Sequence, residues 1–446
     1  MMNNTYRDSR NKSLRQALFT AVLARLAGIA LQVVSLPIAA ATLGPELFSV
    51  YSMLNVVLAW TSLSNLGISQ ATTLHISREA NAEKKLQVFS ASIVMIAFLT
   101  SIVFFMGVLF FYWTPVLSWI FEAHVSDINI VYKPIIIVGF IFLITQYLSV
   151  FEAAQLAAQR QAEFNIATSV GTALAAGAVY WVSQNFVSVL GVILAVHVPV
   201  VVLRVINARN VLKSFGLTVT QLFSVRINDI RSVFRDGLSF VSGGPVSNFL
   251  CHPLSIVLVG AYSESLVTAS YAAVISAIIL VASFFSFVIS PFRGALPEAR
   301  RKGDYDWIRR MYWLTLSANL TYASVPFILL TFFGQPIFEV WYQGSVSPHH
   351  LILLASGLYV LCLAIEVTNY NFLSSLGCLQ SASRWLLFKS ISTAAVVWFL
   401  AFSENSEYIF FGMFFVAFLF SVIPLSVLVL MIIKRKSMES LNNSPQ

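Results

Sequence analysis

An arginine lies inside the first long apolar run of the sequence. Arg25 is flanked on both sides by aliphatic residues, well after the basic N-terminal segment. An arginine near the bilayer midplane costs about 2.5–3.5 kcal/mol on insertion scales, which favours a functional role. Its guanidinium can bind an anionic group bidentately, and Gln32 shares its helix face seven residues later. We expect Arg25 and Gln32 to bind substrate; the alternative is an ion pair of Arg25 with an intramembrane carboxylate.

A glutamate interrupts another apolar run near the C-terminal end. Glu366 is followed by Asn369 and Tyr370, three and four residues later, so the three form one polar stripe on a helix. We expect Glu366 and Asn369 to act in coupling or gating, with the carboxylate carrying a proton or coordinating a cation. The alternative is a structural ion pair between Glu366 and Arg25, or a side chain that reaches toward water.

Further polar residues occur at or near the ends of apolar runs. Glu152 lies with Gln155 close to Arg160, where a carboxylate can reach water, and we consider it a coupling candidate. Asn248 and His252 are one helical turn apart, next to Pro253, which should kink the helix. Both are substrate-binding candidates, although a lone membrane histidine also fits a packing role.

One further arginine could act at the inner mouth of a transport path. Arg293 could attract an anionic substrate there, and it fits positive-inside anchoring equally well.

The composition requires a membrane protein. Of 446 residues, 58% are hydrophobic and 10% are charged, whereas soluble domains carry about 25% charged residues. The net charge of +8 comes from basic residues scattered between apolar runs, so we expect no nucleic-acid partner. The sequence contains no P-loop, no HExxH motif and no CxxC pair, and we therefore expect no cofactor, no metal site and no catalytic residue.

Apolar windows of helix length predict twelve membrane spans. They are 14–36, 47–69, 88–112, 133–155, 164–183, 187–206, 236–260, 268–292, 311–334, 350–373, 385–402 and 408–433. The connections between alternate spans gather Lys and Arg, and Arg384 and Lys389 are assigned to the same side. This segregation predicts a multi-pass protein with both termini in the cytoplasm.

The longest polar connection divides the spans into six and six. We therefore predict an all-α membrane fold of two parallel six-helix bundles around a central cavity. The expected parts are an N-terminal bundle at 1–210, a basic cytoplasmic linker at 211–235 and a C-terminal bundle at 236–446. Weak internal similarity at an offset of about 220 residues supports a parallel repeat.

Two sequence stretches carry a family resemblance. The segment "LQVVSLPIAAATLGPELFSVYSML" at 31–54 and the segment "NLGISQATTLHISREAN" at 65–81 resemble the polysaccharide transporter branch of the multidrug, oligosaccharidyl-lipid and polysaccharide (MOP) flippase superfamily. O-antigen members of that branch move lipid-linked repeat units across the bacterial inner membrane. The resemblance implies alternating access and a substrate in which an oligosaccharide is joined by a diphosphate to undecaprenol.

The resemblance also sets the expected role, location and partners. We expect transport from the cytoplasmic to the periplasmic leaflet of the inner membrane, with Arg25 binding the diphosphate. Membrane lipids, a polysaccharide polymerase and a chain-length regulator would be its partners. Two alternatives stay open: a multidrug or cation antiporter of the same superfamily, whose cavity should be acidic, and a membrane polymerase or acyltransferase, which should have a larger outer loop.

Overall fold

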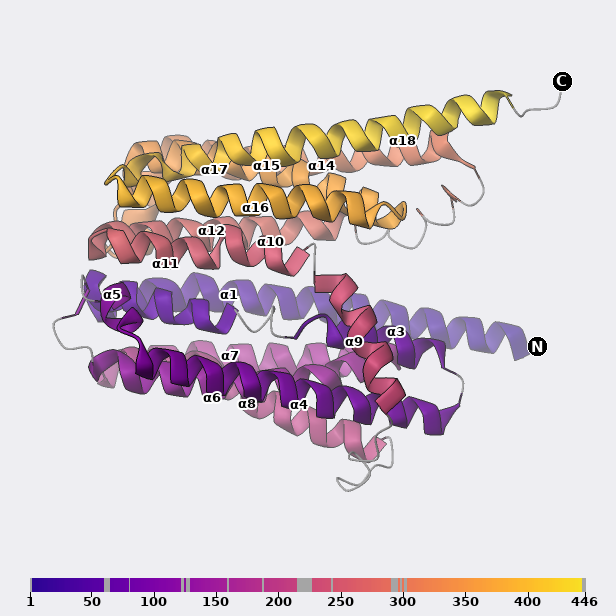
Figure 1. The fold of residues 1–446 in the computed structure, drawn as a ribbon, viewed down its shortest axis with the longest axis horizontal. Coiled ribbons are helices and arrows are strands. Elements are labelled where there is room, and N and C mark those ends of the chain that lie inside the picture. The colour runs from indigo at the N-terminus through magenta and orange to yellow at the C-terminus, as the bar shows by residue number, and fades with distance from the viewer. Residues whose placement is uncertain are drawn as a thin grey trace. The chain divides into compact units, whose positions relative to one another are not determined.

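The computed structural model of the chain is helical throughout its described parts (Figure 1). These are residues 2–59, 65–79, 81–121, 124–125, 129–158, 160–186, 188–214, 227–241, 244–289, 296, 299–300 and 303–442. Within them, ten helical stretches are long and apolar enough to cross a membrane. The predicted all-α integral membrane fold is confirmed.

The chain forms two compact units, Met1–Val241 and Ser242–Gln446. The helices of the first unit are α1 Met2–Ala59, α3 Ile68–Arg78, α4 Ala82–Trp113, α5 Val116–Phe121, α6 Asn129–Ala157, α7 Gln161–Asn185, α8 Val189–Ser214 and α9 Ile227–Val241. The second unit contains α10 Gly244–Cys251, α11 Pro253–Tyr262, α12 Ser265–Ile289, α14 Tyr305–Trp341, α15 His350–Ser375, α16 Leu379–Phe402, the 3-10 turn η3 Ser406–Tyr408, α17 Ile409–Ala417, the π-helical turn η4 Phe418–Val422 and α18 Ile423–Asn442.

A glycine divides α1 into two arms, which correspond to the first two predicted spans. Gly44 has φ 70° and ψ 172°, a backbone conformation that strongly favours glycine. Pro45 follows and can begin a helix, because the first turn does not need its missing N–H. The first arm runs unbroken to residue 43, and the chain turns back at the break (Figure 1).

The seventh predicted span is broken in the middle and starts later than predicted. Residues 236–241 belong to the end of α9 in the first unit, and the apolar stretch is Val246–Tyr262. His252 separates α10 from α11, and Pro253 opens α11. The kink that Pro253 was expected to cause is therefore present. Its cause is that proline cannot donate a backbone hydrogen bond and clashes with the preceding turn.

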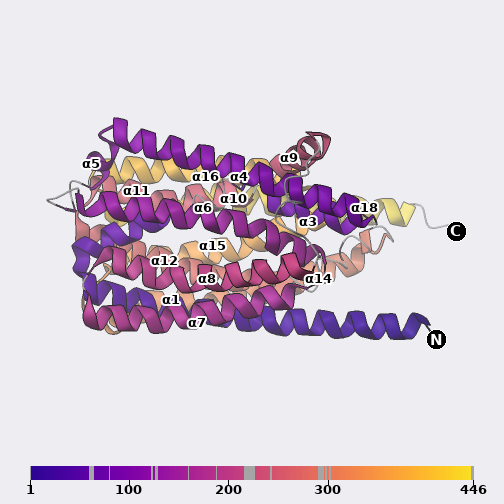
Figure 2. The same cartoon turned by 90° about the horizontal axis from the view of Figure 1, so that it is seen from below.

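The short helix α9 crosses α3 and α4 instead of running along them, as Figures 1 and 2 both show. A Cβ atom at Gly237 would lie 2.7 Å from the carbonyl oxygen of Leu66, so the two backbones meet closely there. His75 Nε2 lies 3.0 Å from Asp236 Oδ2 across the same contact. The part of the predicted linker that α9 occupies is thus packed on the first unit.

Helix α16 begins earlier than its predicted span, and this changes the position of one basic residue. The predicted span started at 385, whereas the helix starts at Leu379. Lys389 therefore lies about 15 Å along the helix from its first residue, at 1.5 Å per residue. It is 1% exposed. The assignment of Lys389 to a water-facing inner connection was wrong.

Candidate functional site

Arg25 projects from the unbroken first arm of α1. At 1.5 Å per residue it lies about 15 Å from Arg15 and about 28 Å from Gly44, well inside a hydrocarbon layer of about 30 Å. Its side chain and that of Gln32 are exposed. Within the described part of its own unit, Arg25 has neither an ion pair nor a hydrogen bond. A pairing with a carboxylate, the structural alternative for Arg25, is not found there.

Glu366 forms an ion pair with Lys389, deep inside the second unit. Lys389 Nζ donates to Glu366 Oε1 at 3.0 Å and to Oε2 at 3.1 Å. Glu366 is 8% exposed and comes from α15, while Lys389 comes from the neighbouring α16. The structural alternative for Glu366 named Arg25 as its partner; the partner is Lys389. Because both carboxylate oxygens accept from the ammonium, the pair carries no net charge.

Asn248 and His252 meet at the break between α10 and α11. His252 Nδ1 lies 3.1 Å from Asn248 Oδ1, and the Tyr359 hydroxyl lies 3.2 Å from His252 Nε2. An amide oxygen only accepts hydrogen bonds, so Nδ1 must carry the proton and the tyrosine hydroxyl must donate to Nε2. His252 is 6% exposed, whereas Asn248 is exposed. The histidine thus orients an asparagine whose amide group stays accessible.

The polar stripe predicted on α15 is split between two environments. Asn369 is fully buried; its Oδ1 accepts from the Tyr312 hydroxyl at 2.9 Å, and its Nδ2 donates to Ser426 Oγ at 2.8 Å. These bonds tie α15 to α14 and α18. Glu366 and Tyr370 instead line a cavity with Lys389. Asn369 therefore joins helices, while the other two residues of the stripe face open space.

The second carboxylate inside a membrane span is also paired. Glu152 on α6 forms an ion pair with Arg204 on α8, and the two side chains are each 18% exposed. Arg160, its expected neighbour, instead forms an ion pair with Glu163 at 2.8 Å. Arg204 was predicted to begin the polar linker, but α8 continues to Ser214 and keeps it inside the helix.

A pair of amides lies one helical turn away from the Glu152–Arg204 pair. Gln155 Nε2 donates to Asn207 Oδ1 at 3.0 Å, and Asn207 Nδ2 donates to Gln155 Oε1 at 2.7 Å. Both side chains are buried. With the ion pair, this reciprocal bond fastens α6 to α8, so Glu152 lies in a structural contact.

Arg293, the remaining substrate-binding candidate, lies outside the described residues. Among the residues that are described, no cluster of three or more His, Cys, Asp or Glu side chains could hold a metal ion.

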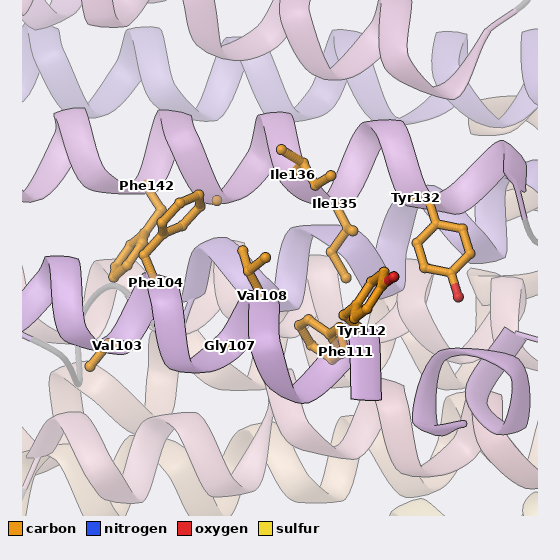
Figure 3. A pocket seen from close by; sticks show the side chains of 11 residues that line it. Val103, Phe104, Gly107, Val108, Phe111, Tyr112, Tyr132, Ile135, Ile136 and Phe142 are labelled. Carbon is orange, nitrogen blue, oxygen red and sulfur yellow. The ribbon is translucent and has the colours of Figure 1, made fainter. Parts of the chain in front are cut away.

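An apolar groove of about 140 Å³ lies between α4 and α6 in the first unit. Figure 3 shows Phe104 and Tyr112 of α4 and Phe142 of α6 around it. No charged side chain is present among the described residues that line it. This groove offers hydrocarbon contact and no partner for an anion.

The sequence reasoning missed two basic residues, Lys389 and Arg204. Both were assigned to the polar ends of spans, although each is flanked by apolar residues on both sides. That flanking is the signal that could have placed them inside a helix, opposite the glutamates that each of them neutralises.

Comparison with known proteins gives similarity in structure but not in sequence. No family model and no curated sequence matches the chain. An inward-facing multidrug resistance MATE family transporter of the MOP superfamily aligns over 95% of this chain and 100% of its own, with TM-score 0.71 and 11% identity. The lipid II flippase MurJ, in an inward closed conformation, aligns over 95% and 90%, with TM-score 0.67 and 14% identity.

A MOP superfamily transporter from Pyrococcus furiosus aligns over 96% of both chains, with TM-score 0.62 and 12% identity. Its description reports a binding pocket of reverse polarity that suggests a different function. The likeness to each of these proteins extends over nearly the whole chain. The chain therefore has the fold of MOP superfamily transporters.

Proposed function

We propose that this protein is a flippase that moves an undecaprenyl-diphosphate-linked oligosaccharide from the cytoplasmic to the periplasmic leaflet of the bacterial inner membrane by alternating access. The observation that carries the proposal is the charge balance of the described spans. Glu152 and Glu366 are neutralised by Arg204 and Lys389, whereas Arg25 is exposed and has no partner in the described part of its unit. The charge left available is positive, which suits an anionic substrate.

The chemistry of the substrate requires such a cation. In hydrocarbon, a diphosphate and a set of sugar hydroxyls lose their hydrogen bonds to water, at several kcal/mol for each unmatched group. The guanidinium of Arg25 can replace part of that hydration through two parallel hydrogen bonds. Gln32, exposed on the same helix, adds an amide. A potential negative inside favours outward movement of an anion by about 2.3 kcal/mol per charge per 100 mV.

The shared fold supports transport, and it includes both substrate classes. One protein of this fold is a lipid II flippase, and another is a multidrug transporter. The multidrug or cation antiporter is therefore the second candidate, favoured by the likeness to the MATE transporter. A cation carrier needs an unpaired carboxylate in its path, and the two glutamates in the described spans are both paired.

Glu366 is retained as a candidate coupling residue, together with Asn369 and Glu152. For Glu366 to bind a proton or sodium, its pair with Lys389 must open during the cycle, since both oxygens are engaged. Transport that is unchanged from pH 6 to 8 and without sodium, with Glu366→Gln fully active, would eliminate this coupling role.

Complementation tests the proposed function. The wild type, Arg25→Ala and Arg25→Lys are expressed at matched membrane levels in a strain that lacks its own flippase but makes the cognate lipid-linked repeat unit. We expect surface polysaccharide with the wild type and none with Arg25→Ala; Arg25→Lys tests whether charge alone suffices. Failure of the wild type, with lipid-linked units present on the cytoplasmic face, would reject the flippase and favour the antiporter.

A further inference from the structure

The second unit contains a polar cavity at mid-membrane depth. It has a volume of about 330 Å³ and is lined by Asn248, Tyr370 and Asn371, by the Glu366–Lys389 pair, and by apolar residues of α12 and α15. Known small-molecule sites start at roughly this size, about 300 Å³. Asn248 is exposed, while Lys389 and Glu366 are buried. The asparagine therefore lies at the mouth and the ion pair at the inner end.

We propose that this cavity binds the sugar part of the lipid-linked substrate. The inference rests on the proposed flippase function and assigns a second subsite, separate from the cation that binds the diphosphate. The first reason is charge: Lys389 and Glu366 are the charged residues among its described lining, and they cancel. A neutral polar cavity suits an uncharged, hydroxyl-rich ligand better than a free cation or anion.

The second reason is the supply of hydrogen-bonding groups. Lys389 uses two of its three N–H donors on Glu366, and each carboxylate oxygen keeps a further lone pair. The Nδ2 group of Asn248 has no partner among the described residues, since the hydrogen bond to His252 uses Oδ1. Donors and acceptors thus alternate within one cavity, as paired sugar hydroxyls require, and the ring of Tyr370 offers an apolar face.

The third reason is that the groups are held in place. His252 fixes the amide of Asn248 and is itself fixed by Tyr359. The hydroxyls of Ser247 and Ser390 are hydrogen-bonded to each other, which joins α10 to α16 beside the cavity. A rigid set of polar groups loses less entropy on binding and rejects ligands whose hydroxyls do not match.

Two variants test the cavity, and a third is the control. Asn248→Leu removes the amide at the mouth, and Ala282→Leu fills the cavity from α12 without touching the ion pair. Asn405→Leu makes the same asparagine change at an exposed position after α16. Reconstituted vesicles would be supplied either with undecaprenyl diphosphate carrying the complete repeat unit or with undecaprenyl diphosphate alone.

Both cavity variants should slow flipping of the sugar-bearing lipid by about tenfold or more, because lost hydroxyl partners discriminate strongly. Flipping of the sugar-free lipid should stay within about twofold of wild type, as should both rates for Asn405→Leu. Equal slowing of the two lipids, or no slowing of either, would overturn the sugar subsite. The sugar-free lipid also reports on folding, since a misfolded variant would lose both activities.

A binding measurement separates the two proposals. The repeat unit, released from its lipid by mild acid, is titrated into purified wild type and Asn248→Leu. Saccharide binding that Asn248→Leu weakens, in a wild type that flips neither lipid, would reject the flippase and support the cavity. Flipping of the sugar-bearing lipid that Asn248→Leu leaves unchanged, with no saccharide binding, would reject the cavity and keep the flippase.

Discussion

Replacing Lys389 by methionine should destabilise the second unit strongly, because it leaves the Glu366 carboxylate buried without a counter-ion. The two side chains are 2% and 10% exposed, and they share hydrogen bonds of 3.0 and 3.1 Å. Breaking such a pair by removing one partner costs about 3–5 kcal/mol, most of it from the stranded charge. At about 2–4 °C per kcal/mol for a unit of this size, the expected fall in Tm is roughly 6–20 °C.

The same reasoning predicts that a second substitution restores stability. In Lys389→Met/Glu366→Gln neither charge is stranded, and neutral replacements of buried pairs are often without cost. The double variant should therefore melt within about 4 °C of wild type, although each single variant melts far below it. The matched control is Arg384→Met on the same helix, an exposed arginine whose loss should change stability by less than about 0.5 kcal/mol.

The cysteines provide the assay. All three, Cys251, Cys362 and Cys378, belong to the second unit, and the first two are buried. A thiol-reactive dye added during a temperature ramp in detergent therefore reports on the unfolding of this unit. If Lys389→Met and Arg384→Met lower the melting temperature by the same small amount, or if the double variant melts as low as the single variants, the assignment of a compensating buried pair is refuted.

Two further predictions concern the first unit. Asn207→Ala should lower the free energy of unfolding by about 1–3 kcal/mol, because it leaves the buried amide of Gln155 without its partner; a chemical denaturation curve no different from wild type would contradict this. Gly237→Ala should destabilise the packing of α9, since its Cβ would lie 2.7 Å from the backbone oxygen of Leu66. Gly177→Ala, where nothing lies within 4 Å, should be neutral or stabilising, and protease sensitivity of α9 distinguishes the two outcomes.

The positions of the spans could be predicted from the sequence because lipid imposes a simple requirement. A backbone that crosses hydrocarbon must be helical and apolar for about 20 residues, so run length alone locates most spans. The break at Pro253 followed from the chemistry of proline. The start of α16 did not follow, because Arg384 and Lys389 occur at the beginning of an apolar run and resemble charges that face water.

The side-chain pairing could not be predicted, for a different reason. Glu366 and Lys389 are 23 residues apart and lie on separate helices, and the contact depends on how α15 and α16 are rotated against each other. A hydrophobicity pattern does not determine that rotation. The exposed position of Arg25 on α1 was easier to anticipate, because an arginine far from both ends of an apolar run must have a polar environment somewhere.

The most direct test of the account is a transport measurement that compares substrates of opposite charge. Vesicles that contain the purified protein and hold a potential negative inside are loaded in turn with the sugar-bearing undecaprenyl diphosphate and with a lipophilic organic cation. We expect outward transfer of the anionic lipid, reduced at least about tenfold in Arg25→Ala, and no transport of the cation. Transport of the cation, with an anionic lipid that stays in place and no effect of Arg25→Ala, would contradict the account and identify a cation carrier.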